Sequence, residues 1–314
     1  MSTLVFVTPT WDAGPWAVEM RKAAPSLTVK VWPDAGKPED VTYCCAWLPP
    51  PDVVKSFTNL KVIFSLGAGV DAILADPTLP KSVPIVRVND SDLTNRMSEY
   101  IVLQVLLHHR QQRALDAAQS RGEWLNPPQA AAKDVTVGIM GLGVLGQDAA
   151  RKLHTLDFKV RGWSRTKKNI EGVESFDASQ LDEFLGGTDI LVSLLPATAD
   201  TDGILNTALF KKLSRKGPLK APVLINAGRG RQQNEDDILA CLNNGTLLAA
   251  SLDVFRKEPL PATSGLWKHP RVTVTPHNAA DSEPATICAY VAEQIRKYEA
   301  GHPLENLVDT KRGY

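Results

Sequence analysis

The chain has 314 residues, of which 43% are hydrophobic and 22% charged, a composition typical of globular proteins and not of disordered ones. Its 35 basic and 35 acidic side chains balance, so the overall charge disfavours binding to nucleic acid or to an anionic membrane. The start lacks the basic region of a secretory signal, and the strongest apolar stretch, 101–107, is far shorter than the roughly 20 residues that cross a bilayer. We therefore expect a soluble, cytoplasmic protein.

Strand-like and helix-like stretches alternate along the whole chain, and this rhythm predicts βαβ units on parallel sheets. Residues 97–118 are rich in helix formers and contain no Gly or Pro, which predicts one linking helix. Ser282-Glu283-Pro284 predicts a last helix capped by Ser282, which returns the chain to the first domain. Two series of strands are expected, at 4–8, 28–32, 42–47, 61–65 and 85–88, and at 135–140, 159–163, 189–194, 223–226, 247–253 and 272–275.

The four cysteines, Cys44, Cys45, Cys241 and Cys288, form no CxxC pair and no cluster with histidine. Buried thiols in a reducing compartment are the simplest interpretation of this pattern. We therefore expect free thiols and no metal site.

A glycine-rich turn follows the first strand of the second series, with the spacing Gly141-x-Gly143-x-x-Gly146. The first glycine permits a tight turn, the second lets a pyrophosphate approach the backbone, and the third allows the next helix to pack closely. The N-terminus of that helix, expected at 144–156, supplies N–H groups to phosphate. Because the motif lies between a strand and a helix, it predicts a dinucleotide site.

The end of the next strand indicates which dinucleotide binds. An NAD enzyme would place Asp or Glu there to bind the ribose hydroxyls. This chain has Ser164-Arg165-Thr166 followed by two lysines, and an arginine fork suits the 2′-phosphate of NADP. We predict that NADPH is the preferred cofactor and NADH a weaker one, the alternative for this segment being a solvated basic loop.

The fold class expected is α/β, with two doubly wound parallel-sheet domains. A Rossmann-type cofactor domain is inserted in a flavodoxin-like substrate domain. We assign 1–100 and 285–314 to the substrate (catalytic) domain, and 101–284 to the dinucleotide-binding domain.

Three charged or titratable residues follow strands in the second series, namely Arg229, Glu258 and His277. Reduction of a carbonyl needs a proton donor, and histidine with a neighbouring carboxylate is suited to that task. An arginine fork can bind both the carboxylate and the carbonyl oxygen of a 2-oxo acid. Singly, the three could be a loop histidine, a surface arginine and a solvated turn residue, but their joint placement at strand ends favours catalysis.

The order of motifs along nearly the whole chain resembles the D-isomer-specific 2-hydroxyacid dehydrogenases, and within them the glyoxylate/hydroxypyruvate reductases. Besides the glycine motif, the resemblance is carried by 66–71 (LGAGVD), 97–100 (MSEY), 195–198 (LPAT), 226–230 (NAGRG), 252–259 (LDVFRKEP), 275–277 (TPH) and the ending 308–314. Two places depart from the family pattern, Arg231-Gln232-Gln233 and Asn278, which would alter the edge of the active site.

The resemblance implies that Arg229 binds the 2-oxo-carboxylate, His277 is the acid/base and Glu258 is its partner. It implies substrate binding by the backbone of 68–70 (Ala68, Gly69 and Val70) and by Trp47, whose alternative is a core tryptophan beside a Pro-rich turn. A homodimer with the linking-helix region at its interface is also implied. The residues expected to bind the cofactor are Gly141, Gly143, Val144, Leu145, Gly146, Ser164, Arg165, Thr166, Leu195, Pro196, Thr198, Ala227 and Asp253.

The predicted function is therefore reduction of a small 2-oxo acid of the glyoxylate/hydroxypyruvate class to the D-2-hydroxy acid, with hydride from NADPH and a proton from His277. Two alternatives stay open. One is a dehydrogenase of a larger 2-oxo acid, such as phenylpyruvate or 2-ketopantoate. The other is a non-catalytic, dinucleotide-sensing binding protein that resembles a corepressor.

Overall fold

The computed structural model describes residues 2–67, 69–88 and 90–310 and separates into two compact units. The first unit comprises the chain up to Leu93 and from Asp281 onward, and the second comprises Thr94–Ala280. The second unit is thus inserted in the sequence of the first. The change from one unit to the other occurs earlier than the sequence-based boundaries at 100 and 284. Across the residues that the structure describes, none of the helices has the length and apolar character required of a membrane span.

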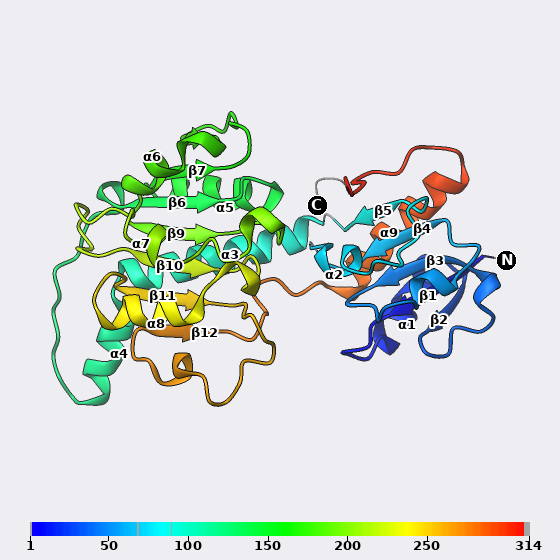
Figure 1. Cartoon of the computed structure of the whole chain (residues 1–314), viewed down its shortest axis with the longest axis horizontal. Coiled ribbons are helices and arrows are strands. Elements are labelled where there is room, and N and C mark those ends of the chain that lie inside the picture. Colours follow the sequence, from blue (N-terminus) through cyan, green and yellow to red (C-terminus); the bar gives the residue numbers. More distant parts are fainter. Residues whose placement is uncertain (1, 68, 89, 311–314) are drawn as a thin grey trace. The chain divides into compact units, whose positions relative to one another are not determined.

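The first unit contains a parallel sheet of five strands in the order β2-β1-β3-β4-β5 (Figure 1). This is the doubly wound order of flavodoxin-like sheets. The strands are β1 (Thr3–Val7), β2 (Thr28–Val31), β3 (Val41–Ala46), β4 (Val62–Ser65) and β5 (Ile85–Arg87).

The strand side chains of the first unit alternate between two apolar layers. Leu4 and Phe6 pack with α1 (Gly14–Ala23) and α9 (Pro284–Glu299), whereas Val5 and Val7 pack against the opposite layer, which includes Ile73 of the short helix α2 (Asp71–Leu74). Burial on both faces explains why these strands are almost wholly apolar, as expected in parallel sheets.

The second unit contains a parallel sheet of seven strands in the order β12-β11-β10-β9-β6-β7-β8. Numbered within the unit, the first six strands have the Rossmann order 3-2-1-4-5-6, with the switch point between β6 and β9. The predicted class, α/β with two parallel sheets, is therefore confirmed. The strands are β6 (Thr136–Met140), β7 (Lys159–Trp163), β8 (Val173–Phe176), β9 (Ile190–Ser193), β10 (Val223–Asn226), β11 (Ala249–Leu252) and β12 (Val272–Val274).

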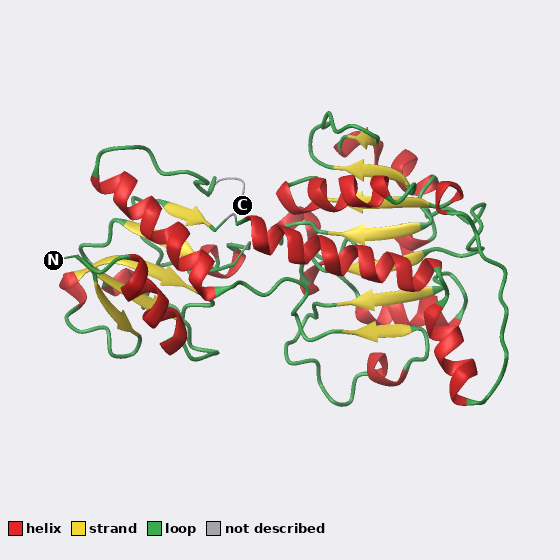
Figure 2. Ribbon diagram, turned by 180° about the vertical axis from the view of Figure 1, so that it is seen from behind, coloured by secondary structure: helices red, strands yellow, loops and turns green. Residues whose placement is uncertain are grey.

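Helices cover both faces of the second sheet. The long helix α3 (Ser91–His109) lies across the strands together with α5 (Val144–Thr155), and Figure 2 shows α3 in front of the sheet. The opposite face is covered by three helices, α6 (Leu181–Gly186), α7 (Thr207–Phe210) and α8 (Glu235–Asn243).

The predicted linking helix is two helices in the structure, α3 and α4 (Gln112–Ser120). The break falls at Gln111, which takes a left-handed backbone conformation (φ 56°) and whose side-chain amide donates to Pro128 O at 2.7 Å. No Gly or Pro marks this break, so the sequence pattern missed it. The helix also begins earlier than predicted, because the carboxylate of Asp90 accepts the N–H groups of Asp92 and Leu93.

Two further elements differ from the sequence-based expectation. Strand β8 was not predicted, because it is an edge strand that pairs only with β7 and carries exposed Glu174 among its four residues. The last helix is capped by Glu283, whose carboxylate accepts the Thr286 N–H at 2.7 Å, and not by Ser282. The Ser282 hydroxyl instead donates to Leu66 O at 3.2 Å.

Candidate active site

The glycine turn after β6 has the backbone geometry that its sequence predicts. Gly141 has φ +102°, a conformation that side chains disfavour, and its N–H donates to Trp163 O on β7. A Cβ on Gly146 would lie 1.9 Å from Gly141 O, so only glycine lets α5 pack this closely. A Cβ on Gly143 would meet nothing within 4 Å, which leaves the backbone at the start of α5 open to a ligand.

The neighbouring loop after β7 carries the basic segment. The Ser164 hydroxyl donates to Thr166 O at 2.8 Å, which folds the loop into a short turn. Arg165 and Thr166 are exposed, as are the two lysines that follow them. β6 and β7 are adjacent and parallel, so this basic loop and the glycine turn lie at the same edge of the sheet.

Two more predicted cofactor segments follow β9 and β10. Leu195 is 7% exposed and Ala227 is 5% exposed, so both contribute mainly backbone to this edge. Thr201 closes the β9 loop, because its hydroxyl donates to Pro196 O at 2.7 Å and accepts the Thr198 N–H at 2.9 Å. The switch point of the sheet, between β6 and β9, thus lies between these loops and the glycine turn.

His277 and Glu258, which follow β12 and β11, form a direct pair. His277 Nδ1 lies 2.7 Å from Glu258 Oε2, and both side chains are about one third exposed, at 35% and 38%. The second oxygen of Glu258 accepts the Phe255 N–H at 2.9 Å, which fixes the carboxylate plane. An ionised carboxylate only accepts hydrogen bonds, so Nδ1 carries the hydrogen of the pair and Nε2 is the ring nitrogen suited to proton exchange.

The pKa of the Glu258 carboxyl lies below its usual value. Burial opposes ionisation, but the hydrogen bonds from His277 and from the Phe255 N–H, with the nearby charge of Arg229, outweigh burial. Glu258 is therefore ionised near neutral pH.

We expect this lowered pKa to appear in the pH dependence of stability. A carboxyl whose pKa is depressed in the folded state stabilises the fold above its unfolded pKa, about 4.3, and loses that contribution as the pH falls through the folded pKa. The difference in melting temperature between wild type and Glu258→Gln should be largest at neutral pH and shrink below about pH 4. Thermal unfolding across this range measures it, and a difference independent of pH would contradict the depressed pKa.

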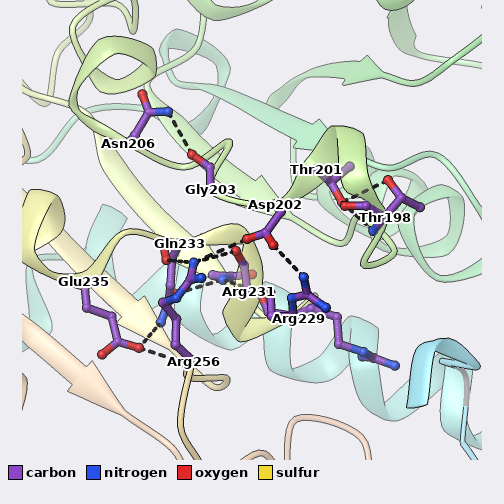
Figure 3. A network of polar contacts seen from close by, with 11 residues as sticks. Thr198, Thr201, Asp202, Gly203, Asn206, Arg229, Arg231, Gln233, Glu235 and Arg256 are labelled. Atoms are coloured by element: carbon purple, nitrogen blue, oxygen red, sulfur yellow. Dashed lines mark hydrogen bonds and ion pairs between the residues drawn. The ribbon is translucent and has the colours of Figure 1, made fainter. Parts of the chain in front are cut away.

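Arg229 lies in the loop after β10 and is half-buried. Its guanidinium donates to Gly228 O at 2.8 Å, and its charge acts on Glu258. Figure 3 shows Arg229 on the same turn as Arg231, whose guanidinium pairs with Asp202 at 2.7 Å. The structure thus brings Arg229, Glu258 and His277 together at one edge of the second sheet.

Asp253 holds the loop that carries His277. Its side chain is 1% exposed, and it accepts the Thr275 hydroxyl at 2.6 Å and the N–H groups of Asn278 and Ala279 at 3.1 Å. His277 itself has a left-handed backbone (φ 55°), which is costly for a residue with a side chain, and its N–H donates to Asp253 O. A cofactor contact by Asp253 stays a prediction, whereas its part in holding this strained loop is visible.

The predicted substrate-binding residues outside this edge belong to the first unit. Ser65 Oγ lies within hydrogen-bond distance of Gly67 O (3.0 Å) and Gly69 O (2.9 Å), which organises the turn after β4. Val70 is buried, and Ala68 lies outside the described residues. The ring of Trp47 fills the space where a Gly67 side chain would stand, since a Cβ there would lie 2.3 Å from the indole.

Metal ligation has no candidate among the described residues, where no group of three or more His, Cys, Asp or Glu side chains could hold an ion. The four cysteines are buried and free.

Comparison with protein families identifies the family of the domain that carries this site. The model of the NAD-binding domain of D-isomer-specific 2-hydroxyacid dehydrogenases matches residues 102–279, more than half of the chain. The chain belongs to this family. The matched range contains the glycine turn and all three residues of the predicted catalytic group, and the resemblance inferred from sequence is confirmed.

Relatives in this dehydrogenase family match over nearly their full length. A glyoxylate/hydroxypyruvate reductase A of Escherichia fergusonii is 42% identical, with 99% of each chain covered. An NADPH-dependent glyoxylate/hydroxypyruvate reductase of Sinorhizobium meliloti, solved with NADP and sulfate, is 50% identical with a TM-score of 0.95 over 100% of both chains. A probable 2-hydroxyacid dehydrogenase of Rhizobium etli, solved with NADP, HEPES and L(+)-tartaric acid, is 46% identical with a TM-score of 0.94, covering 100% of this chain and 99% of that one.

The sequence pattern left one feature of this dehydrogenase site unexplained. Gln232 and Gln233 attracted notice only because they stand where the family commonly has apolar residues. In the structure both are fully buried, at 0% exposure, in the turn that carries Arg229. The signal in the sequence was two adjacent glutamines at positions where the family commonly has apolar residues. Such amides, when buried, need several hydrogen-bond partners, so they could have been predicted to connect neighbouring loops.

Proposed function

We propose that the protein reduces a small 2-oxo acid, glyoxylate or hydroxypyruvate, to the D-2-hydroxy acid with NADPH. The observation that carries the proposal is the 2.7 Å contact of His277 Nδ1 with Glu258 Oε2, with Arg229 close enough to act on the same carboxylate. The relatives named as glyoxylate/hydroxypyruvate reductases support the substrate class. The NADP-bound relatives support the cofactor.

In the proposed mechanism, the ionised Glu258 orients the imidazole of His277 through Nδ1, and His277 Nε2 gives its proton to the carbonyl oxygen of the 2-oxo acid. The guanidinium of Arg229 binds the substrate carboxylate and polarises that oxygen. Bound NADPH would supply the hydride to the carbonyl carbon. In the reverse direction His277 would accept the proton of the hydroxyl group.

The residues present fit an NADP molecule. The open side of Gly143 and the N-terminus of the 12-residue helix α5 would accept the pyrophosphate. The loop of Ser164, Arg165 and Thr166, in which Arg165 and Thr166 are exposed, would bind the 2′-phosphate, because it offers a guanidinium and hydroxyl groups and no carboxylate. The backbones near Leu195 and Ala227 would line the nicotinamide half.

The cofactor preference provides a direct prediction. Arg165→Ala should raise the KM for NADPH by about 10-fold or more, because a charge-assisted pair with the phosphate is lost, and change the KM for NADH less than 2-fold. Lys133→Ala, which removes another exposed basic residue ahead of β6, is the matched control. Equal effects of Arg165→Ala on both cofactors would exclude Arg165 from phosphate recognition.

We propose that Trp47 and the backbone of Gly69 and Val70, in the first unit, contact the substrate. The contact of Trp47 with Gly67 fixes the indole beside the turn that carries the other two residues. If Trp47 contacts the substrate, Trp47→Phe should raise the KM for the 2-oxo acid and leave the affinity for NADPH unaltered. If Trp47 is only a core residue, the KM for the 2-oxo acid should stay unchanged.

We propose further that the protein is a homodimer located in the cytoplasm. Trp124, which follows α4, is 99% exposed, and Leu125 beside it is 45% exposed, which favours an interface in the linking-helix region. Trp124→Ser should shift the sedimentation coefficient from dimer to monomer, whereas Trp267→Ser, at a tryptophan that is 50% exposed elsewhere, should not. A monomeric wild type would contradict the proposed dimer. The four free thiols support the proposed location, because the cytoplasm is a reducing compartment.

The function itself is tested by following NADPH absorbance with a panel of acids. We expect turnover with glyoxylate and hydroxypyruvate to exceed that with phenylpyruvate and 2-ketopantoate. If the enzyme prefers phenylpyruvate or 2-ketopantoate, the proposed substrate class is wrong, but the proposed mechanism of reduction still applies. Tight binding of NADPH with no turnover of any acid would instead support a dinucleotide sensor.

A further inference from the structure

Two buried glutamine amides connect the loops on which the proposed site is built. Gln232 and Gln233 are adjacent in the turn after Arg229, and both side chains are 0% exposed. A glutamine amide offers two donor hydrogens and an acceptor oxygen, so burial requires partners for all of them. The structure provides these partners from three different strand ends.

Gln232 joins the Arg229 turn to the loop after β9. Its Oε1 accepts the Ser193 hydroxyl at 2.9 Å and the backbone N–H of Arg229 at 3.3 Å. Its Nε2 donates to Leu195 O at 2.6 Å and approaches Pro196 O at 3.3 Å. One side chain therefore sets the distance between Arg229 and a loop that we assign to the cofactor.

Gln233 joins the same turn to the loop after β11. Its Oε1 accepts the side-chain amide of Asn226 at 2.8 Å, and its Nε2 donates to Val254 O at 2.8 Å and to Glu235 Oε1 at 3.3 Å. Val254 immediately precedes Phe255, whose N–H binds the Glu258 carboxylate. Gln233 thus connects the Arg229 turn to the segment that holds the His277–Glu258 pair.

Charged side chains surround the turn on its exposed side. Asp202 accepts Arg231 Nη2 at 2.7 Å and Arg256 Nη1 at 3.4 Å, and Arg256 also donates to Arg231 O at 3.0 Å (Figure 3). These pairs are partly solvated, so they hold the turn weakly compared with buried amides. Backbone N–H groups of Gly203 and Leu205 also donate to Arg231 O and Gln232 O, at 2.9 and 2.8 Å. The two buried amides are the side chains of the turn that reach both the loop after β9 and the loop after β11.

We infer that Gln232 and Gln233 are positioning residues, which set Arg229 relative to the cofactor loop and to the His277–Glu258 pair. The inference rests on the proposed function, since it assigns a purpose to geometry at that site. Gln232 connects Arg229 to the cofactor loop, so its loss should weaken both NADPH and substrate binding. Gln233 connects Arg229 to the acid pair, so its loss should affect the 2-oxo acid and leave NADPH binding intact.

The experiment compares Gln232→Met and Gln233→Met, which keep side-chain volume and remove the hydrogen bonds, with Gln294→Met. Gln294 is the matched control, because it is 1% exposed and hydrogen bonded to Glu305, yet it lies on α9 in the first unit. Each variant is measured for NADPH affinity by fluorescence, for kcat and KM with glyoxylate, and for melting temperature. Gln233→Asn, a shorter amide, replaces Gln233→Met if the latter does not fold.

For Gln233→Met we expect kcat/KM for glyoxylate to fall by about 10- to 100-fold at an NADPH affinity within 2-fold of wild type, since small displacements of a binding group cost this much. For Gln232→Met we expect the NADPH dissociation constant and the KM for glyoxylate to rise together, by about 5-fold or more. Gln294→Met should lower the melting temperature and leave these constants unchanged.

The two proposals fail in different ways. If the Gln232 and Gln233 variants match Gln294→Met in every kinetic constant while wild type turns over glyoxylate, the amides are structural only and the inference is wrong. If the wild-type protein reduces no 2-oxo acid, the proposed function is wrong, and the inference that rests on it is wrong with it. An equal loss of NADPH affinity and of kcat/KM for glyoxylate in Gln233→Met would overturn the role assigned to Gln233, and a loss confined to one of the two ligands in Gln232→Met would overturn the role assigned to Gln232.

Discussion

His277→Asn should lower kcat for reduction of the 2-oxo acid by about 10²- to 10⁴-fold, the usual contribution of a general acid. Asparagine can still donate a hydrogen bond to Glu258, but its amide does not deliver a proton near neutral pH. The dissociation constant of NADPH should stay within about 2-fold, because the predicted cofactor contacts lie on other loops. Single-turnover kinetics and fluorescence titration separate the two quantities.

His269→Asn is the control for that experiment. His269 precedes β12, whereas His277 follows it, so the two residues lie at opposite ends of one strand. We expect the control to keep most of its activity. A His277→Asn enzyme that retains more than about a tenth of wild-type kcat would remove His277 from proton transfer.

Arg229→Ala should lower kcat/KM by about 10²- to 10³-fold, because the carboxylate of a 2-oxo acid loses a charge-assisted, bidentate partner. Arg229→Lys keeps the charge and loses the planar fork, so we expect it to recover only part of the loss. Most of the effect should appear in KM for the acid, with a further effect on kcat if the guanidinium also polarises the carbonyl.

Arg231→Ala is the matched control for Arg229. It removes an arginine two residues away whose side chain is 68% exposed and paired with Asp202. We expect less than a 3-fold change in kcat/KM, as is usual for a solvated ion pair. A larger loss of kcat/KM in Arg231→Ala than in Arg229→Ala would contradict this assignment. It would indicate that Arg231, which departs from the family pattern, binds the substrate in place of Arg229.

The features that sequence predicted well are those whose causes lie within one strand, turn and helix. Gly141, Gly143 and Gly146 span six residues of chain, and their spacing already requires the turn and close packing seen in the structure. The strand series was readable for the same reason, because buried parallel strands are continuous apolar runs. Strand β8 escaped detection because its exposed edge position lets polar residues interrupt that run.

Contacts between distant segments were beyond the sequence pattern. His277 and Glu258 were both expected at strand ends, yet their 2.7 Å contact depends on the adjacent placement of β11 and β12. Gln232 meets Ser193, which is 39 residues away, and Gln233 meets Val254, which is 21 residues away. Neither spacing has a periodic signal, so the two amides were noticed only as departures from a family pattern.

By itself, the sequence determined the two parallel-sheet domains, the glycine turn, the basic loop after β7 and the identity of the three residues proposed for catalysis. Hydrophobic periodicity and glycine spacing act over a few residues, and the chain displays them without reference to its fold. Only the tertiary structure decided the break between α3 and α4, the role of Asp253 in holding a strained His277 loop, and the glutamine pair behind Arg229. These depend on partners that chain folding brings together, because a buried polar group is satisfied by whichever segment packs against it.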